Sequence, residues 1–216
     1  MSAVSFQIRV CKNPDCGLRY PLSKESRFGE RCPVCLGETV PVLERSTSQE
    51  KVQDISPLPL DTHLYALLDN IRSALNVGSI FRSADGFEFS HIYLCGITPT
   101  PELSEVRKSA VGAEQYVKWS THKNGVELIN SLKNMDYEIW ALENTQNSIA
   151  INTAIANFQK PKRLLLVVGN EVTGVDPGIL EIVDHITHLP MRGQKRSFNV
   201  AIAFAIAAQI INSWNC

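Results

Sequence analysis

Apolar residues along this chain form short runs, and beyond about residue 60 these runs alternate with longer segments of helical periodicity. Such alternation predicts a mostly parallel sheet covered on both faces by helices, which is an α/β fold. The predicted strands are residues 64–68, 91–95, 137–142, 164–168 and 185–189. The predicted helices are residues 77–84, 104–116, 125–132, 177–183 and 199–214, while residues 149–156 are left open as a loop or a short helix.

The start of the chain follows a different pattern. Up to about residue 44 it holds many turn-forming residues and little continuous apolar sequence. A segment this small does not bury enough surface to fold unaided, and a bound metal ion would compensate. Residues 46–59 are polar and end in prolines, which is typical of a linker. In a chain of 216 residues we therefore expect a small module at residues 1–45, a linker at 46–59 and one full-sized domain at 60–216.

Four of the six cysteines lie in the small module, in the spacing Cys-x4-Cys, fifteen residues, Cys-x2-Cys. Two cysteines on a tight turn point at one ion, and two such pairs complete the tetrahedral shell that zinc prefers. The predicted zinc ligands are Cys11, Cys16, Cys32 and Cys35. Redox-active thiols and unrelated buried cysteines are the alternatives. Cys95 and Cys216 match no ligand spacing and are predicted to be structural.

Aromatic and basic side chains also lie near these cysteines, namely Lys12, Arg19, Tyr20 and Arg31. Aromatic rings stack on unpaired bases and cations meet phosphates, so one interpretation is that the module contacts RNA. The other is that it only folds and packs, and the sequence leaves both open.

Composition narrows the function classes further. The chain is 44% hydrophobic and lacks an apolar stretch of the roughly 20 residues that a membrane span needs. Its start has no basic segment followed by an apolar core, so no secretory signal is predicted and residence in the cytoplasm is expected. A formal net charge of −1 argues against a generic DNA-coating protein. A local basic face still suffices for a substrate held by a few phosphate contacts.

Three loops follow predicted strands and hold most of the candidate chemistry: residues 76–82, 169–174 and 189–200. The carboxyl ends of parallel strands meet at one edge of a sheet, where ligands bind. Leu142, Leu189 and Met191 would form apolar walls for an adenine ring, and free backbone amides would read its edge. Gly169 ends a strand where we expect a side chain to block the approach of a ligand. The pattern suits a small polar cofactor and a polyanionic substrate.

The same loops carry three motifs: Asn76-x-Gly-x3-Arg82, Gly169-x-Glu171-x2-Gly174, and Leu189-Pro-Met-x-Gly-x3-Ser197-x-Asn199-Val. In order and spacing, together with residues 108–114, they resemble the SpoU branch of the SPOUT superfamily, the RNA ribose 2′-O-methyltransferases. The resemblance covers roughly seven-tenths of the chain. It implies an α/β trefoil knot at the carboxyl terminus, S-adenosylmethionine bound in that knot, and a homodimer with the site at the subunit interface.

The resemblance also implies residue roles. Arg82 would activate or orient the ribose hydroxyl, although an arginine pKa above about 12 makes it an unusual base; a simple ion pair is the alternative. Asn76 would position Arg82 or the ribose, or cap a helix starting at Val77. The catalytic set is Arg82, Asn76, Glu171, Ser197 and Asn199. The cofactor set is Leu142, Gly169, Glu171, Leu189, Met191 and Ser197.

Smaller roles follow for the remaining positions. Glu171 would fix a loop amide or a substrate hydroxyl, or cap the helix that follows it. Ser197 and Asn199 would cap the last helix and also face cofactor or substrate. Phosphate contacts to tRNA or rRNA are expected from Arg192, Lys195 and Arg196.

Other functions fit the sequence less well. A nicotinamide-dependent enzyme would carry G-x-G-x-x-G after its first strand, and the glycine loop here differs and comes late. A hydrolase of the common α/β type would carry a G-x-S-x-G turn, which is absent from the sequence. A non-catalytic RNA-binding module and an RNA base methyltransferase stay open. The sequence does not choose between tRNA and rRNA.

Overall fold

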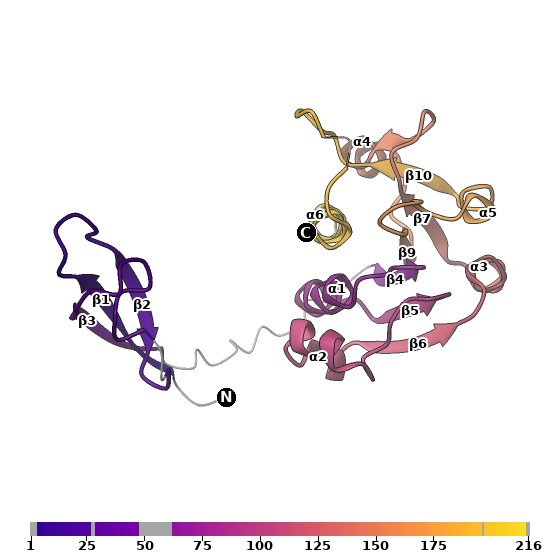
Figure 1. The fold of residues 1–216 in the computed structure, drawn as a ribbon. Coiled ribbons are helices and arrows are strands. Elements are labelled where there is room, and N and C mark those ends of the chain that lie inside the picture. Colours follow the sequence, from indigo (N-terminus) through magenta and orange to yellow (C-terminus); the bar gives the residue numbers. More distant parts are fainter. Residues whose placement is uncertain (1–3, 27–28, 48–61, 196, 215–216) are drawn as a thin grey trace. The chain divides into compact units, whose positions relative to one another are not determined.

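The computed structural model describes residues 4–26, 29–47, 62–195 and 197–214. The chain divides into two compact units, Met1–Leu58 and Pro59–Cys216, drawn in Figure 1. We call them the amino-terminal unit and the carboxy-terminal unit, and each is described by itself.

The amino-terminal unit is a three-stranded antiparallel sheet in the order β2-β1-β3. Its strands are β1 (Val4–Cys11), β2 (Arg19–Ser23) and β3 (Thr39–Thr47). Strand β3 therefore extends two residues into the segment predicted to be a linker, and the remaining linker residues lie outside the described part of the chain. Among the described residues of this unit, Cys11, Cys32 and Thr39 are buried. Because this core is so small, most of the stability of the unit has to come from the hydrogen bonds of the sheet and from the cysteine cluster.

The carboxy-terminal unit is built on a seven-stranded sheet in the order β6-β5-β4-β9-β7-β10-β8, and every pair in it is parallel. The strands are β4 (His63–Asp69), β5 (His91–Cys95), β6 (Lys118–His122), β7 (Glu138–Leu142), β8 (Ile149–Ala150), β9 (Arg163–Val168) and β10 (His185–His188). From β4 the chain continues to β5 on one side, whereas from β9, which pairs with β4, it continues to β10 on the other side. This junction is a topological switch point, where sheets of this class bind ligands.

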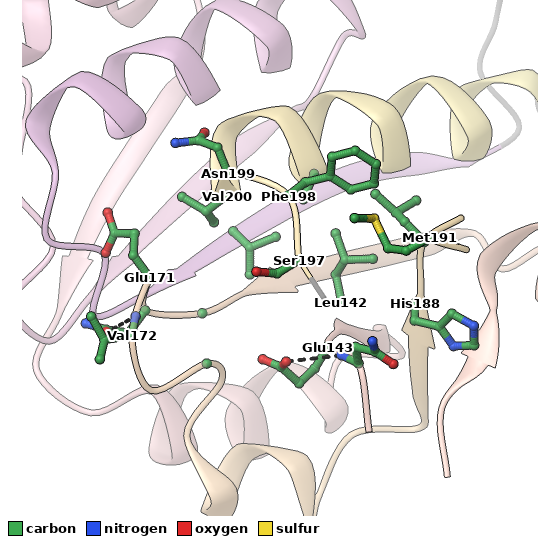
Figure 2. A pocket seen from close by; sticks show the side chains of 17 residues that line it. Leu142, Glu143, Glu171, Val172, His188, Met191, Ser197, Phe198, Asn199 and Val200 are labelled. Carbon is green, nitrogen blue, oxygen red and sulfur yellow. Dashed lines mark hydrogen bonds between the residues drawn. The ribbon is translucent and has the colours of Figure 1, made fainter. Parts of the chain in front are cut away.

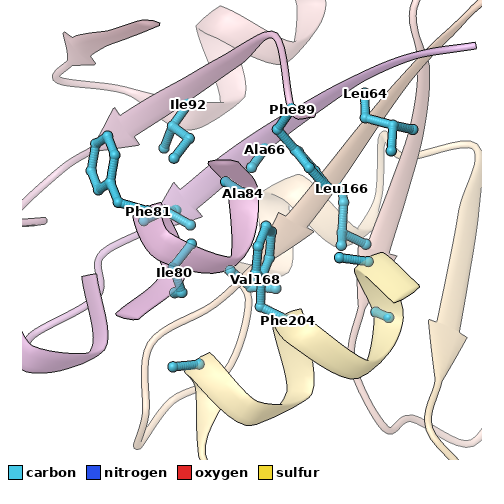
Figure 3. Packing of buried hydrophobic residues seen from close by; sticks show 14 of the residues in the cluster. Leu64, Ala66, Ile80, Phe81, Ala84, Phe89, Ile92, Leu166, Val168 and Phe204 are labelled. Atoms are coloured by element: carbon cyan, nitrogen blue, oxygen red, sulfur yellow. The ribbon is translucent and has the colours of Figure 1, made fainter. Parts of the chain in front are cut away.

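Helices cover both faces of this sheet (Figure 1). One face carries α1 (Ala74–Gly86), α2 (Ser104–Ala110), α4 (Ile151–Asn157) and α6 (Val200–Ser213), and the other carries α3 (Gly125–Lys133) and α5 (Pro177–Leu180). The larger core lies under the first group. There Phe204 of α6 contacts Phe89, with ring centroids 5.1 Å apart, beside Val168 of the central strand β9 (Figure 3).

These elements confirm the predicted α/β class and all five predicted strands. Strand β6 was missed because Lys118-Trp-Ser-Thr-His122 is mostly polar, as an edge strand can be. The helix predicted at 104–116 was wrong in its length. It ends at Ala110 because Val111 and Gly112 adopt left-handed backbone, with φ of 55° and 95°, and a short 3-10 turn (Ala113–Gln115) follows.

Two further expectations changed at short elements. The helix predicted at 177–183 stops at Leu180, and the region left open at 149–156 forms β8 followed by α4. The threading of the carboxyl-terminal chain into a knot stays a prediction. Within the described ranges, the apolar helices are all too short to cross a membrane.

Candidate active site

A pocket of about 290 Å³ opens where strands β7, β9 and β10 end. These three strands are neighbours in the sheet, so the loops after them meet although they are far apart in the sequence. The residues that line it come from the ends of these strands and from the loops after them: Leu142, Glu143, Asn144, Val168, Gly169, Asn170, Glu171, Val172, Gly174, His188, Leu189, Met191, Ser197, Phe198, Asn199, Val200 and Ala203. All the residues predicted for the cofactor line it: Leu142, Gly169, Glu171, Leu189, Met191 and Ser197. Their binding role itself stays a prediction.

One wall of the pocket is apolar. Figure 2 shows Leu142 of β7 and Met191 on one side of Ser197, with Val200 at the start of α6 above it. Val168, Leu189 and Ala203 add to the same lining. The opposite part is formed by polar groups of residues 143–144 and 170–171. A flat apolar ring with a polar extension matches such a lining.

The loop of the second motif folds back tightly on itself. Asn170 and Gly174 exchange backbone hydrogen bonds of 3.0 and 2.9 Å, and Gly174 has a φ of 74°, which favours glycine. A Cβ on Gly169 would lie 2.2 Å from the backbone nitrogen of Val175. The missing side chain of Gly169 therefore makes room for the loop's own backbone, while the expected effect of a side chain there on a ligand stays a prediction.

Glu171 holds this loop against the start of α1. Its carboxylate accepts hydrogen bonds from the backbone N–H groups of Arg72 (2.9 Å) and Ser73 (3.0 Å) and from the side-chain amide of Asn76 (2.9 Å). Partial burial alone would raise the pKa of Glu171, but these hydrogen bonds outweigh it and lower the pKa below its ordinary value. Glu171 is thus an ionised clamp on loop amides. This is one of the roles expected for it, but the amides that it holds belong to the start of α1 and not to the helix after Glu171.

Asn76 and Asn199 extend this clamp to the third motif. The side-chain amide of Asn199 donates to Oδ1 of Asn76 at 3.1 Å, while its own Oδ1 accepts from the backbone of Ala201 and Ile202. Asn199 is therefore the N-cap of α6, as expected. Asn76 is not an N-cap, because α1 begins three residues earlier than predicted, after Ser73. The chain of contacts Glu171–Asn76–Asn199 links all three motifs.

Arg82 is not brought to this pocket within one chain. It lies on α1, six residues after Asn76, which is about 9 Å along the helix axis and on a different side of it. Its side chain is exposed, and it is not among the residues that line the pocket. Its predicted catalytic role stays a prediction.

The predicted RNA contacts lie on the loop between Met191 and Ser197. Arg192 and Lys195 are exposed there, and Arg196 lies outside the described residues. Ser197 lines the pocket just before α6. The loop thus places cations directly beside the lining of the pocket.

Several residues that line the pocket were not expected, among them Glu143, Asn144, Asn170 and His188. Glu143 and Asn144 follow Leu142, Asn170 lies inside the identified loop 169–174, and His188 lies in the strand predicted at 185–189, directly before Leu189. Ligands bind at the carboxyl ends of parallel strands, and Glu143 comes one position after Leu142 at such an end. Applying this rule to polar side chains as well as apolar ones would have predicted Glu143.

The four cysteines of the amino-terminal unit come together as predicted. Their sulfur atoms all lie within 4.8 Å of one another, with 3.4 Å between Cys11 and Cys35 and 3.7 Å between Cys16 and Cys32. Four thiolates about 2.3 Å from a tetrahedral zinc ion are separated by about 3.8 Å, so the donor set and its size fit zinc. Cys95 is buried in the other unit, and Cys216 lies outside the described residues.

Comparisons with known proteins agree with this geometry. The model of the SpoU rRNA Methylase family matches residues 63–209. A protein of Borreliella burgdorferi described as an uncharacterized tRNA/rRNA methyltransferase is 33% identical over 140 residues, and a tRNA (guanosine(18)-2′-O)-methyltransferase of Aquifex aeolicus is 29% identical over 149 residues. These matches cover 65% and 66% of this chain but only 59% and 65% of the relatives. The chain therefore spans about six-tenths of the length of the curated relatives it matches.

Solved structures resemble the carboxy-terminal unit. The A. aeolicus TrmH/SpoU tRNA modifying enzyme superimposes with a TM-score of 0.63 at 25% identity, covering 72% of this chain and 77% of that one. An AdoMet-bound rRNA methyltransferase from Sinorhizobium meliloti gives a TM-score of 0.64 at 24% identity, covering 70% and 56%. The second likeness is one of fold alone.

Proposed function

Because the chain belongs to the SpoU rRNA Methylase family, whose model matches residues 63–209, we propose that it methylates RNA with S-adenosylmethionine, at a ribose 2′-hydroxyl of tRNA or rRNA. The observation that carries this proposal is the pocket at the ends of β7, β9 and β10, which residues 142–144 and the loops of the second and third motifs build together. The A. aeolicus relative is named a tRNA 2′-O-methyltransferase and the B. burgdorferi relative an uncharacterized tRNA/rRNA methyltransferase, which supports the same substrate class.

The pocket suits the proposed cofactor. The apolar wall of Leu142, Leu189 and Met191 accepts the adenine ring, and the polar residues opposite accept the ribose and amino-acid portions. When bound, S-adenosylmethionine supplies an electrophilic methyl group on a sulfonium. The residues of this chain then have to hold the RNA hydroxyl in line with that methyl group and accept its proton.

Glu171 does not fit the part of a proton acceptor, because its oxygens are engaged by three donors and its pKa is lowered. In our proposal Glu171, Asn76 and Asn199 fix the loops, while Arg82 orients the hydroxyl and the neighbouring phosphate. Arg192, Lys195 and Arg196 hold the RNA backbone beside the pocket.

We propose that the active form is a homodimer with the pocket at its interface. Large apolar side chains remain exposed around the pocket: Leu75 of α1 is 64% exposed, Val172 is 74% exposed and Ile202 of α6 is 53% exposed. Burial of such residues by a second copy is favourable. Leu75 and Arg82 are seven residues apart on α1 and so lie on the same side of it. A second copy of the chain that covers Leu75 would therefore also contact Arg82.

We further propose that the four cysteines of the amino-terminal unit hold a structural zinc ion. The buried Cys11 and Cys32 and their two neighbours supply a closed set of four thiolates, which leaves no position for a substrate. The ion would stabilise a unit with very few other buried residues.

The test is to incubate the purified chain with tritiated S-adenosylmethionine and total RNA, and to digest the labelled RNA to nucleosides. The expected label is on ribose, in nucleosides that lack a free 2′-hydroxyl. Label on a base would indicate a base methyltransferase instead. RNA binding without cofactor binding or transfer would indicate a non-catalytic RNA-binding protein.

A further inference from the structure

Glu143 stands at the end of strand β7, directly after the apolar wall residue Leu142. Its backbone N–H donates to the carbonyl oxygen of Thr187 in β10 at 2.9 Å, which fixes the position of the residue between two neighbouring strands. Its side chain lines the pocket (Figure 2). The residue thus places a carboxylate beside the surface on which the adenine ring is expected to lie.

This carboxylate is held in one orientation. One oxygen accepts a hydrogen bond from the backbone N–H of Val175 at 3.0 Å, and the other accepts one from the N–H of Asn144 at 3.1 Å. A Cβ on Gly174 would lie 2.4 Å from the first oxygen, so the second-motif loop packs directly against the carboxylate. An acceptor fixed in this way loses little further entropy when a ligand binds.

The same carboxylate keeps unused acceptor capacity. Each carboxylate oxygen has two lone pairs, and the two backbone donors occupy only one on each. Among the residues that the structure describes, Glu143 forms no ion pair. A fixed anion that lines a pocket and has no neutralising partner in the described part of the chain favours a ligand with hydroxyl or cationic donors.

We propose that Glu143 recognises the ribose of the methyl donor by accepting a hydrogen bond from one of its two hydroxyl groups. The inference rests on the proposed use of S-adenosylmethionine. The ribose is attached to the adenine, so when the ring lies against Leu142 the hydroxyls come to the polar side of the pocket, where Glu143 stands. A carboxylate is the group that reads ribose hydroxyls in other nucleotide sites of α/β sheets.

The alternative is that Glu143 has only a structural role and holds the loop in place through Val175 and Asn144. A thermodynamic cycle that combines a protein variant with altered ligands separates the two roles. The dissociation constants of S-adenosylhomocysteine and of its 2′-deoxy and 3′-deoxy analogues are measured by calorimetry for the unmodified chain and for Glu143→Gln. Glu181→Gln, at an exposed position at the end of α5 and away from the pocket, is the matched control.

A hydrogen bond from a hydroxyl to a carboxylate predicts that the unmodified chain and the control bind one deoxy analogue roughly 10- to 100-fold more weakly than S-adenosylhomocysteine. In Glu143→Gln this ratio is expected to fall to within a few-fold of one. A pure brace weakens all three ligands equally and leaves the ratio unchanged, which would overturn the inference.

Two other outcomes also decide the matter. If the unmodified chain binds both deoxy analogues as tightly as the parent compound, the inference is wrong whether or not the variant folds. If the unmodified chain does not bind S-adenosylhomocysteine at all, the proposed function itself fails, and the inference fails with it.

Discussion

The clamp formed by Glu171 makes a sharp prediction for the substitution Glu171→Gln. One carboxylate oxygen accepts from Ser73 and Asn76, and the other accepts from Arg72. A glutamine keeps one oxygen, which can serve the first pair, but its NH2 group then faces the N–H of Arg72. The variant therefore loses one hydrogen bond, places two donors against each other and removes the charge that strengthens the remaining bonds.

The expected cost is about 1–2 kcal/mol at neutral pH. Hydrogen bonds to charged groups contribute about 1.5–3 kcal/mol when buried, and the exposure of Glu171 lets water replace part of that. The pKa of Glu171 is lowered in the folded chain from its ordinary value of 4.5. Its stabilising contribution is therefore fully present above about pH 4.5 and is lost as the pH falls through the lower, folded-state value.

Urea unfolding followed by tryptophan fluorescence measures this cost in the relevant unit, because all three tryptophans lie in the carboxy-terminal unit. We expect the difference in unfolding free energy between Glu171→Gln and the unmodified chain to be constant from pH 7 to about pH 5 and to shrink below pH 4.5. The control Glu181→Gln should change stability by less than about 0.5 kcal/mol. A Glu171→Gln difference no larger than this control, or one that grows in acid, would refute the clamp.

Four further outcomes are expected. Arg82→Ala should leave cofactor binding intact and abolish methyl transfer; unaltered turnover would remove Arg82 from the mechanism. Cys32→Ser should lose the zinc that metal analysis finds in the reduced, unmodified chain, and absence of zinc in that chain would contradict the cysteine site. Gly169→Ala should lower the unfolding free energy by at least about 2 kcal/mol, because its Cβ meets the backbone of Val175, and a neutral effect would contradict the tight loop. Ile202→Asp should leave the fold intact but dissociate the dimer in sedimentation, whereas a monomeric unmodified chain would exclude the dimer.

The alternation of apolar runs was enough to predict most of the carboxy-terminal unit. Strands such as Leu164–Val168 are buried on both faces, so they are continuously apolar and easy to recognise. Strand β6 was missed because it lies at the edge of the sheet, where polar residues are tolerated. The early end of α2 depends on a left-handed backbone at Val111, and a β-branched residue gives no warning of that conformation.

The lining of the pocket was also predictable, because the ends of parallel strands meet at one edge. The contacts among the motifs were not. The hydrogen bonds from Asn199 to Asn76 and from Asn76 to Glu171 join residues 123 and 95 positions apart, and no local pattern encodes them. For the same reason no local rule for Gly169 revealed its close backbone neighbour, Val175 on the returning loop.

These contacts bear on how the proposed chemistry is divided among the motif residues. Asn199 uses one side-chain oxygen to cap α6 and its amide to reach Asn76, while Asn76 uses its amide to reach Glu171. Both the amide nitrogen and the oxygen of each asparagine are therefore engaged before any substrate arrives. Their substitution should move loops and helix ends, and so change cofactor and RNA affinity together with turnover. In our proposal Arg82 is the charged group that acts on the acceptor. Because its exposed position on α1 lies outside the pocket of its own chain, in the proposed dimer it would serve the pocket of the second copy.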